Sequence, residues 1–221
     1  MRHRCRRGGP TRSLGSPRPW ASSLGRCTLD DLGAARLWTE FVAARLTTGD
    51  LDGDGWAELV AGSAGQPAWG LNPDGALGWA FAVRDPVVGD VAFPDASWLV
   101  VEGLDPAEGF GADAAVGDFN GDGCADLAVG ANGSDLNAYS PPGKVYVFDG
   151  PFTGGTLSAA DADVVLQGEV DWDFFGFALA VGDYDGDGID DLAVSAPWDD
   201  TAGWEAGSVY ILTGARSADP G

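Results

Sequence analysis

The chain has 221 residues, of which 45% are apolar, so a buried core can extend over most of its length. Acidic residues outnumber basic ones by 34 to 12, and the formal net charge is −22. Such a chain repels nucleic acid phosphates, and no apolar run reaches the ~18–20 residues that span a bilayer. We therefore expect no nucleic-acid partner and no membrane span, and metal cations are the natural counter-ions.

Residues 1–29 differ from the rest of the chain in composition. They hold seven of the twelve basic residues and no acid, and they are rich in Pro, Gly and Ser. They lack the apolar region of ~7–15 residues that a secretory signal needs. We expect a disordered basic tail, with contact to acidic partners as an alternative role. The only histidine, His3, falls in this tail, so the remaining chain has no imidazole for acid–base chemistry.

An acidic, glycine-rich turn recurs three times along the chain. The copies read GDLDGDGWAE (49–58), GDFNGDGCAD (117–126) and GDYDGDGIDD (182–191). Their first aspartates are 68 and 65 residues apart. A nearly fixed period of this size marks an array of supersecondary units. The chain is therefore predicted to be a repeat protein.

Each turn carries a full set of candidate metal ligands. Counted from its first aspartate, it has oxygen-bearing side chains at positions 1, 3, 5 and 9 and glycine at positions 4 and 6. A sharp glycine turn with convergent oxygens is the arrangement that gives Ca²⁺ its six to eight ligands at ~2.3–2.6 Å, whereas Mg²⁺ retains more water. We predict about three Ca²⁺ ions. The side-chain ligands, with the position-7 residues that offer a carbonyl, are Asp50, Asp52, Asp54, Trp56 and Glu58; Asp118, Asn120, Asp122, Cys124 and Asp126; and Asp183, Asp185, Asp187, Ile189 and Asp191.

The surroundings of the turns favour strands over helices. An EF-hand needs a bidentate Glu at position 12, where this chain has Ala61, Val129 and Val194. The turns are instead followed by ELVAG, DLAVG and DLAVS and are preceded by runs such as ADAAVGD. A strand–loop–strand metal site is therefore expected, with a merely solvated acidic turn as the alternative. Because only the carbonyl of Cys124 is needed, we expect its side chain to be a small buried thiol, and three cysteines are too few for a disulfide framework.

Further strands complete each repeat. A glycine-led run follows at GWAFAV (78–83), GKVYVF (143–148) and GSVYIL (207–212), and a fourth run follows in the first two copies at 97–103 and 163–168. Period-2 alternation in these runs is typical of a half-buried sheet. The boundaries that follow are 1–29 for the tail, 38–104, 105–168 and 169–214 for three units, and 215–221 for a C-terminal tail.

The order Phe-Gly, acidic loop, Gly-Ala-Pro resembles the FG-GAP repeat, the blade unit of the integrin α-chain β-propeller. The pair Phe-Gly stands at 110–111 and 175–176, whereas the first unit has Val42-Ala43 and is degenerate. The resemblance implies an all-β fold, a partial propeller of about three four-stranded blades, with Ca²⁺ between the first two strands of each. Propellers close a ring with about four to eight blades. The remaining blades are thus expected from further sequence or from another chain, with an open arc as the alternative.

The resemblance also implies extracellular or cell-surface recognition or adhesion, and no catalytic role. We expect a protein or glycan ligand on the face opposite the acidic loops, which carries Asn132, Asp135, Tyr139, Asp171, Trp172, Asp173, Trp198, Asp199, Asp200 and Trp204. The alternative is that these tryptophans pack between blades. Two other functions stay open: an accessory propeller of a secreted hydrolase, and a purely structural spacer.

Overall fold

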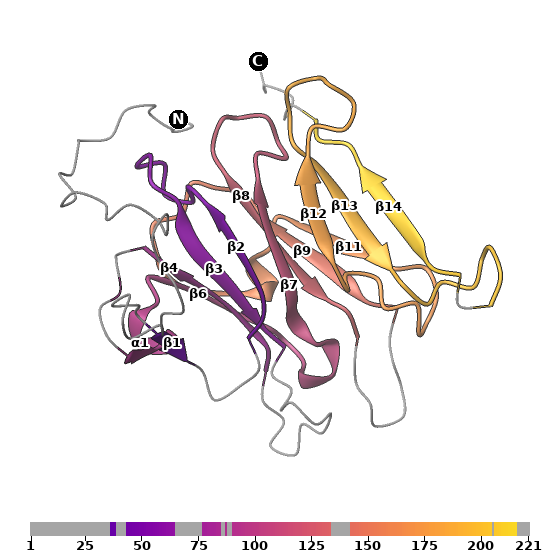
Figure 1. Cartoon of the computed structure of the whole chain (residues 1–221), viewed down its shortest axis with the longest axis horizontal. Coiled ribbons are helices and arrows are strands. Elements are labelled where there is room, and N and C mark those ends of the chain that lie inside the picture. Colours follow the sequence, from indigo (N-terminus) through magenta and orange to yellow (C-terminus); the bar gives the residue numbers. More distant parts are fainter. Residues whose placement is uncertain are drawn as a thin grey trace, which may run out of the picture.

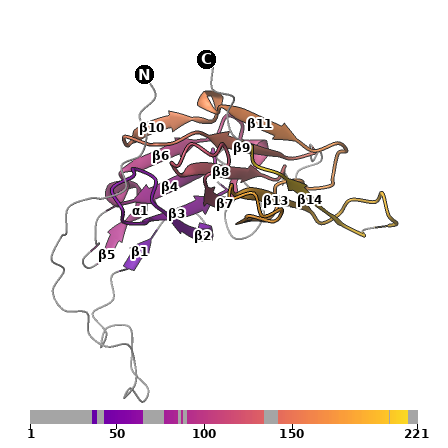
Figure 2. The same ribbon diagram turned by 90° about the horizontal axis from the view of Figure 1, so that it is seen from above.

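The computed structural model describes residues 36–38, 43–64, 77–84, 87, 90–133, 142–204 and 206–215. The predicted basic tail, 1–29, lies outside the described residues. Within them the chain is built almost entirely of strands, which form three larger twisted sheets standing side by side and one small two-stranded sheet (Figures 1 and 2). No helix in this part of the chain is long and apolar enough to cross a membrane.

Blade 1 is antiparallel and contains β2 (Ala43–Gly49), β3 (Glu58–Ser63), β4 (Trp79–Val83) and β6 (Leu99–Glu102). Each strand pairs with the next along the chain, so the blade is an up-and-down meander. The acidic turn at 49–58 is the hairpin between its first two strands. The strands lie where the sequence predicted them.

Blades 2 and 3 repeat this order. Blade 2 comprises β7 (Phe110–Gly117), β8 (Asp126–Ala131), β9 (Lys144–Phe148) and β11 (Val164–Gln167). Blade 3 comprises β12 (Leu179–Gly182), β13 (Asp191–Ala196) and β14 (Ser208–Leu212). The predicted all-β fold of propeller blades is confirmed.

Several short elements were not predicted. In the connection between β9 and β11, strand β10 (Gly155–Ser158) crosses to blade 1 and pairs in parallel with β6 (Figure 2). Strands β1 (Arg36–Trp38) and β5 (Asp90–Ala92) pair in parallel, and the one-turn helix α1 (Phe93–Ala96) follows β5. Two 3₁₀ turns, η2 (Pro106–Glu108) and η3 (Ala159–Asp161), begin with side-chain caps from Asp105 and Ser158. These segments are too short to give a periodic signal in the sequence.

The core lies between the blades. Strand β9 shows why, because its side chains alternate between two apolar layers: Tyr146 and Phe148 pack in the layer shared with blade 1, and Val145 and Val147 in the layer shared with blade 3. All four are less than 9% exposed. A strand buried on both faces requires apolar residues at every position, which explains the unbroken run VYVF.

The Phe-Gly pair joins each blade to the one before it. Phe110 is fully buried and meets Tyr146 edge-to-face, with ring centroids 5.5 Å apart. Gly111 has φ +85°, and a Cβ there would collide with backbone atoms of Trp79 and Ser63 in blade 1. Only glycine permits this approach of two backbones. The Phe-Gly motif therefore serves the packing of one blade against the next.

The two outer faces of the array differ. Behind blade 1, the face that carries Phe81 and Val83 is covered by Phe93 of α1 and by Leu37 of β1. On blade 3, Val209 and Ile211 are 66% and 56% exposed, although their counterparts in blade 2, Val145 and Val147, are buried. The array thus has one covered end and one open end.

Candidate metal centre

The three acidic loops lie at the same edge of the array, between the first and second strands of each blade (the upper edge in Figure 1). Each loop begins as the inner strand ends at Gly49, Gly117 or Gly182. Because the hairpins are equivalent, the blade geometry places three similar sites along one edge. Neighbouring loops also touch: the Asp118 amide donates to Asp190 Oδ2 at 3.0 Å.

The same hydrogen bonds shape each loop from within. The amide of position 6 donates to the position-1 carboxylate at 2.9–3.0 Å, as for Gly55 and Asp50. Position 5 donates to the side chain at position 3, and position 7 donates to the carboxylate at position 5. The glycines at positions 4 and 6 all have φ between +66° and +91°, a region costly for other residues. The sequence pattern of alternating acids and glycines is thus the pattern of a tight turn whose amides point at carboxylates.

The acidic side chain at position 9 lies at the base of each loop. Glu58, Asp126 and Asp191 are completely buried at the first residue of the second strand, and each accepts a hydrogen bond from the position-2 amide at 2.7–2.9 Å. In loops 2 and 3 the other carboxylate oxygen accepts from Gly150 or Gly214, which follow the third strand. Buried carboxylates at such a position need partners.

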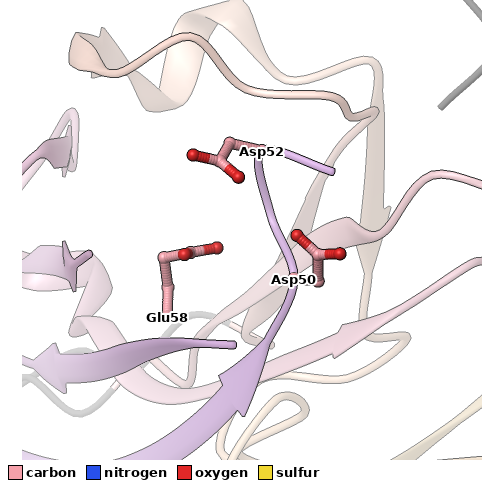
Figure 3. A group of neighbouring side chains, drawn as sticks. All are labelled: Asp50, Asp52 and Glu58. Atoms are coloured by element: carbon pink, nitrogen blue, oxygen red, sulfur yellow. The ribbon is translucent and has the colours of Figure 1, made fainter. Parts of the chain in front are cut away.

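Loop 1 has carboxylate oxygens without partners. Asp50 Oδ1 and Glu58 Oε1 are buried and have no hydrogen-bond partner. In Figure 3 the side chains of Asp50, Asp52 and Glu58 converge on one space, and one carboxylate oxygen from each lies within 4.8 Å of those from the other two. Two buried, unsatisfied anionic oxygens facing a common centre fit a cation with hard oxygen ligands. The residues present therefore fit Ca²⁺.

Loops 2 and 3 vary this arrangement. In loop 3, Asp183, Asp185 and Asp191 offer oxygens within 4.8 Å of one another. In loop 2, the amide of Asn120 stands at position 3, and its nitrogen lies 3.4 Å from Asp126 Oδ1. An amide supplies an oxygen ligand without charge, so positions 1, 3, 5 and 9 of loop 2 carry one negative charge fewer than the same positions of the other loops.

The position-5 carboxylates lie apart from these groups. Asp54, Asp122 and Asp187 are exposed, and each accepts from the amide two residues later. At position 7, Trp56 is 45% exposed, whereas Cys124 and Ile189 are buried. The prediction of a free thiol at Cys124 is wrong, because this cysteine is disulfide-bonded. One bridge between distant cysteines leaves no spacing signal in the sequence.

Burial governs the protonation of the position-9 acids. It raises the pKa of Glu58 to about 7. The neighbouring carboxylates raise this pKa a little further, whereas the hydrogen bond from the Leu51 amide lowers it. Burial likewise raises the pKa of Asp126 to about 7, against hydrogen bonds from Gly150 and Phe119. In loop 3 the hydrogen bond from Gly214 dominates and holds the pKa of Asp191 below its usual range. Each of the first two loops therefore holds a carboxylate that is only partly ionised near pH 7.

Comparison with known proteins agrees with this geometry. The profile of the FG-GAP repeat matches residues 42–77, 110–148 and 175–212, which together make up just over half of the chain. The chain belongs to the FG-GAP repeat family. Each matched segment spans an acidic loop and its flanking strands.

Relatives of two kinds share these FG-GAP repeats. Rat phosphatidylinositol-glycan-specific phospholipase D is 32% identical over 168 residues, 74% of this chain and 19% of that protein. Mouse integrin alpha-7 is 34% identical over 200 residues, 85% of this chain and 16% of the integrin. Human integrin alpha-IIb is 37% identical over 119 residues, 52% of this chain and 11% of the integrin. The chain thus spans about a fifth or less of the length of these relatives.

Sequence reasoning missed one charged residue at FG-GAP loop 1. Arg84, directly after β4, places Nη1 3.2 Å from Asp52 Oδ2, and its guanidinium lies 5.5 Å from the centre of the Trp98 ring. No sequence motif links Arg84 to Asp52, because the two residues are 32 positions apart. Arg84 could have been singled out only because basic residues are rare, since five follow residue 30.

The opposite edge of the FG-GAP blades carries the segments predicted to bind a ligand (the lower edge in Figure 1). Trp172, Trp198 and Trp204 are 47%, 53% and 87% exposed, so they are not buried between the three described blades. Trp198 stands edge-to-face on Phe174, with ring centroids 4.6 Å apart. Asp173 and Asp199 are buried, as is Asn132, whereas Asp171 and Asp200 are exposed. The candidates Asp135 and Tyr139 lie outside the described residues.

Proposed function

We propose that this FG-GAP chain is a Ca²⁺-binding propeller segment, with one ion in each of its three acidic loops. The observation that carries the proposal is the pair of buried, unpartnered oxygens, Asp50 Oδ1 and Glu58 Oε1, that face the same space as Asp52. Without a cation, a buried carboxylate of this kind is strongly unfavourable. The repeated hydrogen bonds show that the other two loops are built on the same plan.

The choice of Ca²⁺ follows from ligand chemistry. Each loop offers several protein oxygens and neither imidazole nor thiolate, because Cys124 is engaged in a disulfide. Oxygen-only sites exclude the softer transition metals, and Mg²⁺ requires a rigid octahedron and retained waters. When bound, the ion would supply the positive charge that allows the clustered acids to stay ionised, and so it would fix the ends of the first two strands in every blade.

Isothermal titration calorimetry tests this proposal. We expect about three Ca²⁺ per chain and little competition from Mg²⁺ at equal concentration. Affinities on the order of 10⁻⁴–10⁻³ M are typical of extracellular modules. A folded sample, verified by circular dichroism, that takes up no Ca²⁺ at 10 mM would contradict the assignment.

We further propose that the segment serves recognition or adhesion outside the cell or at its surface. Similarity to integrin chains supports a role in recognition or adhesion. The disulfide of Cys124 supports an oxidising compartment such as the cell exterior. The ligand would bind at the edge opposite the Ca²⁺ loops, where exposed tryptophans stand on a rigid scaffold.

A comparison of blades 2 and 3 favours a basic group on a protein ligand. In blade 2, Glu108 pairs with Lys144 and accepts from the Tyr146 hydroxyl at 3.0 Å. At the corresponding places blade 3 has Asp173, Ser208 and Tyr210, so the acid remains and the base is missing. Burial raises the pKa of Asp173, and nearby acids add to the effect. A lysine or arginine from a partner would take the place of the Lys144 ammonium.

Binding of a biotinylated lysine-rich peptide, read by biolayer interferometry, tests this part. We expect binding to wild type and loss of binding in Asp173→Asn, with Asp95→Asn, an exposed acid on α1, as the charge-matched control. Equal binding to both variants would contradict a specific site. Binding of a neutral glycan array with no peptide binding would instead assign the edge to sugars.

Similarity to phospholipase D supports a second candidate, an accessory propeller of a secreted hydrolase. The match covers 19% of that enzyme, and we propose no catalytic role for this segment. Hydrolysis of a phosphatidylinositol-glycan substrate by the chain alone would overturn that part of the proposal.

A further inference from the structure

Loop 1 has a basic side chain, Arg84, bonded to one of its acids, and among the described residues no ion pair is seen at loop 2 or loop 3. The Arg84 guanidinium bonds Asp52 Oδ2, and Asp52 Oδ1 accepts from the Asp54 amide. Both oxygens of Asp52 are therefore engaged, whereas Asp50 Oδ1 and Glu58 Oε1 are not. The residues that follow the third strand in blades 2 and 3, at the place of Arg84, are Asp149 and Thr213.

The position of Arg84 is held from two sides. Strand β4 ends opposite the start of β3, with Val83 paired to Leu59, so the following residue lies beside the loop. The guanidinium is then steadied over the Trp98 ring, whose own backbone is tied to β4 by a 2.8 Å hydrogen bond to Ala82 O. The Arg84 side chain is 40% exposed, so it can swing out toward water without disturbing the core.

We propose that Arg84 is an internal competitor for the metal site of loop 1, which makes this loop the weakest of the three Ca²⁺ sites. The inference rests on the proposed Ca²⁺ binding. The Arg84 guanidinium must leave before Asp52 can turn Oδ2 to the ion. If it stayed, its positive charge would lie next to the divalent cation and repel it. Loop 1 therefore fills last, and its filling moves Arg84 away from Trp98.

The expected size of the effect is modest. A partly exposed ion pair such as Arg84–Asp52 favours the paired over the unpaired arrangement by about two- to fivefold, and Ca²⁺ must overcome this preference. Removing the positive charge of Arg84 also removes its repulsion of Ca²⁺, which adds a further gain in affinity that depends on salt. Replacing Arg84 should therefore strengthen the weakest site by about three- to tenfold and leave the other two within about twofold. The gain should shrink at high ionic strength, because the repulsion is screened.

Calcium titrations of wild type, Arg84→Met and Arg45→Met test the proposal, followed by calorimetry and by tryptophan fluorescence. Methionine keeps an apolar stem on Trp98 and removes the charge. Arg45, at the far end of β2, is the charge-matched control. We expect two tighter sites and one weaker site in wild type and in Arg45→Met, and three more similar sites in Arg84→Met.

Fluorescence identifies which site is the weak one. The low-affinity phase should change the emission in wild type, and this change should be smaller in Trp98→Phe, where Trp56 of loop 1 and seven other tryptophans remain. Unchanged affinities in Arg84→Met, or an equal gain in Arg45→Met, would overturn the competitor role while Ca²⁺ binding stands. Absence of Ca²⁺ uptake in every folded variant would overturn the metal sites themselves.

Discussion

Replacing Glu58 with Gln should have opposite effects on stability with and without Ca²⁺. Glu58 is fully buried, and one of its oxygens has no partner. Glutamine keeps the shape and an oxygen for the Leu51 amide, and it removes the buried charge. In chelator the variant should therefore be more stable than wild type, whereas in Ca²⁺ it should gain less from the ion.

The magnitude follows from two estimates. Burial raises the pKa of Glu58 from 4.5 to about 7, a rise that corresponds to at most ~3 kcal/mol. Water reaches the open side of the loop, so we expect about 1–2 kcal/mol, or roughly 2–8 °C in melting temperature. A Ca²⁺ site adds ~2.7 kcal/mol at a hundredfold excess over Kd and less when its Kd is larger, so the loss of loop 1, the weakest of the three sites, should remove less than a third of the Ca²⁺-induced rise.

Differential scanning calorimetry at pH 7.5, in chelator and in 10 mM Ca²⁺, measures both effects. The control is Glu102→Gln, which removes the same charge on β6 at the opposite end of blade 1. The control should behave like wild type in its response to Ca²⁺. A Glu58→Gln variant that melts lower than wild type in chelator, or that keeps the full Ca²⁺-induced rise, would refute the reasoning.

Three further outcomes are expected. Asp187→Ala should weaken one site, because it removes one of the predicted ligands, and should lower the melting temperature more in Ca²⁺ than in chelator, where only the hydrogen bond to the Ile189 amide is lost; an equal drop in chelator would contradict this. In chelator the fold should lose stability as pH rises from about 4.5 to above 7, because the folded-state pKa values of Glu58 and Asp126 are raised, so the folded chain holds the extra protons; a melting temperature that climbs over this range would be inconsistent. Wild type should associate in sedimentation at 0.5 M salt through the open face of blade 3, and Val209→Asp with Ile211→Asp should reduce association; a stable monomer in both would show that the face needs no cover.

The fold could be predicted from the sequence because each blade repeats the same local rules. The runs VYVF and VYIL fix strands, and the Phe-Gly pair at 110–111 fixes where the next blade begins. Because three copies occur at nearly one period, each weak local signal is observed three times. Degenerate blade 1 was still recognised, because its acidic loop is intact although Val42-Ala43 replaces Phe-Gly.

What the sequence did not reveal depends on contacts between distant segments. The crossing of β10 to β6, the cover over Phe81 and the Arg84–Asp52 pair each join residues with no shared motif. The disulfide of Cys124 is of the same kind. Local pattern predicts which residues ring a loop, but only the folded arrangement shows that Glu58 Oε1 has no partner and that Asp52 already has one.

A crystal structure of the chain grown in 10 mM CaCl₂ would test the metal assignment most directly. We predict Ca²⁺ in all three loops, identified by its anomalous signal, with Asp50 Oδ1 and Glu58 Oε1 at ~2.3–2.6 Å from the ion in loop 1 and Arg84 turned away from Asp52. Loops that hold only water under these conditions, with the two oxygens still unpartnered, would contradict the account.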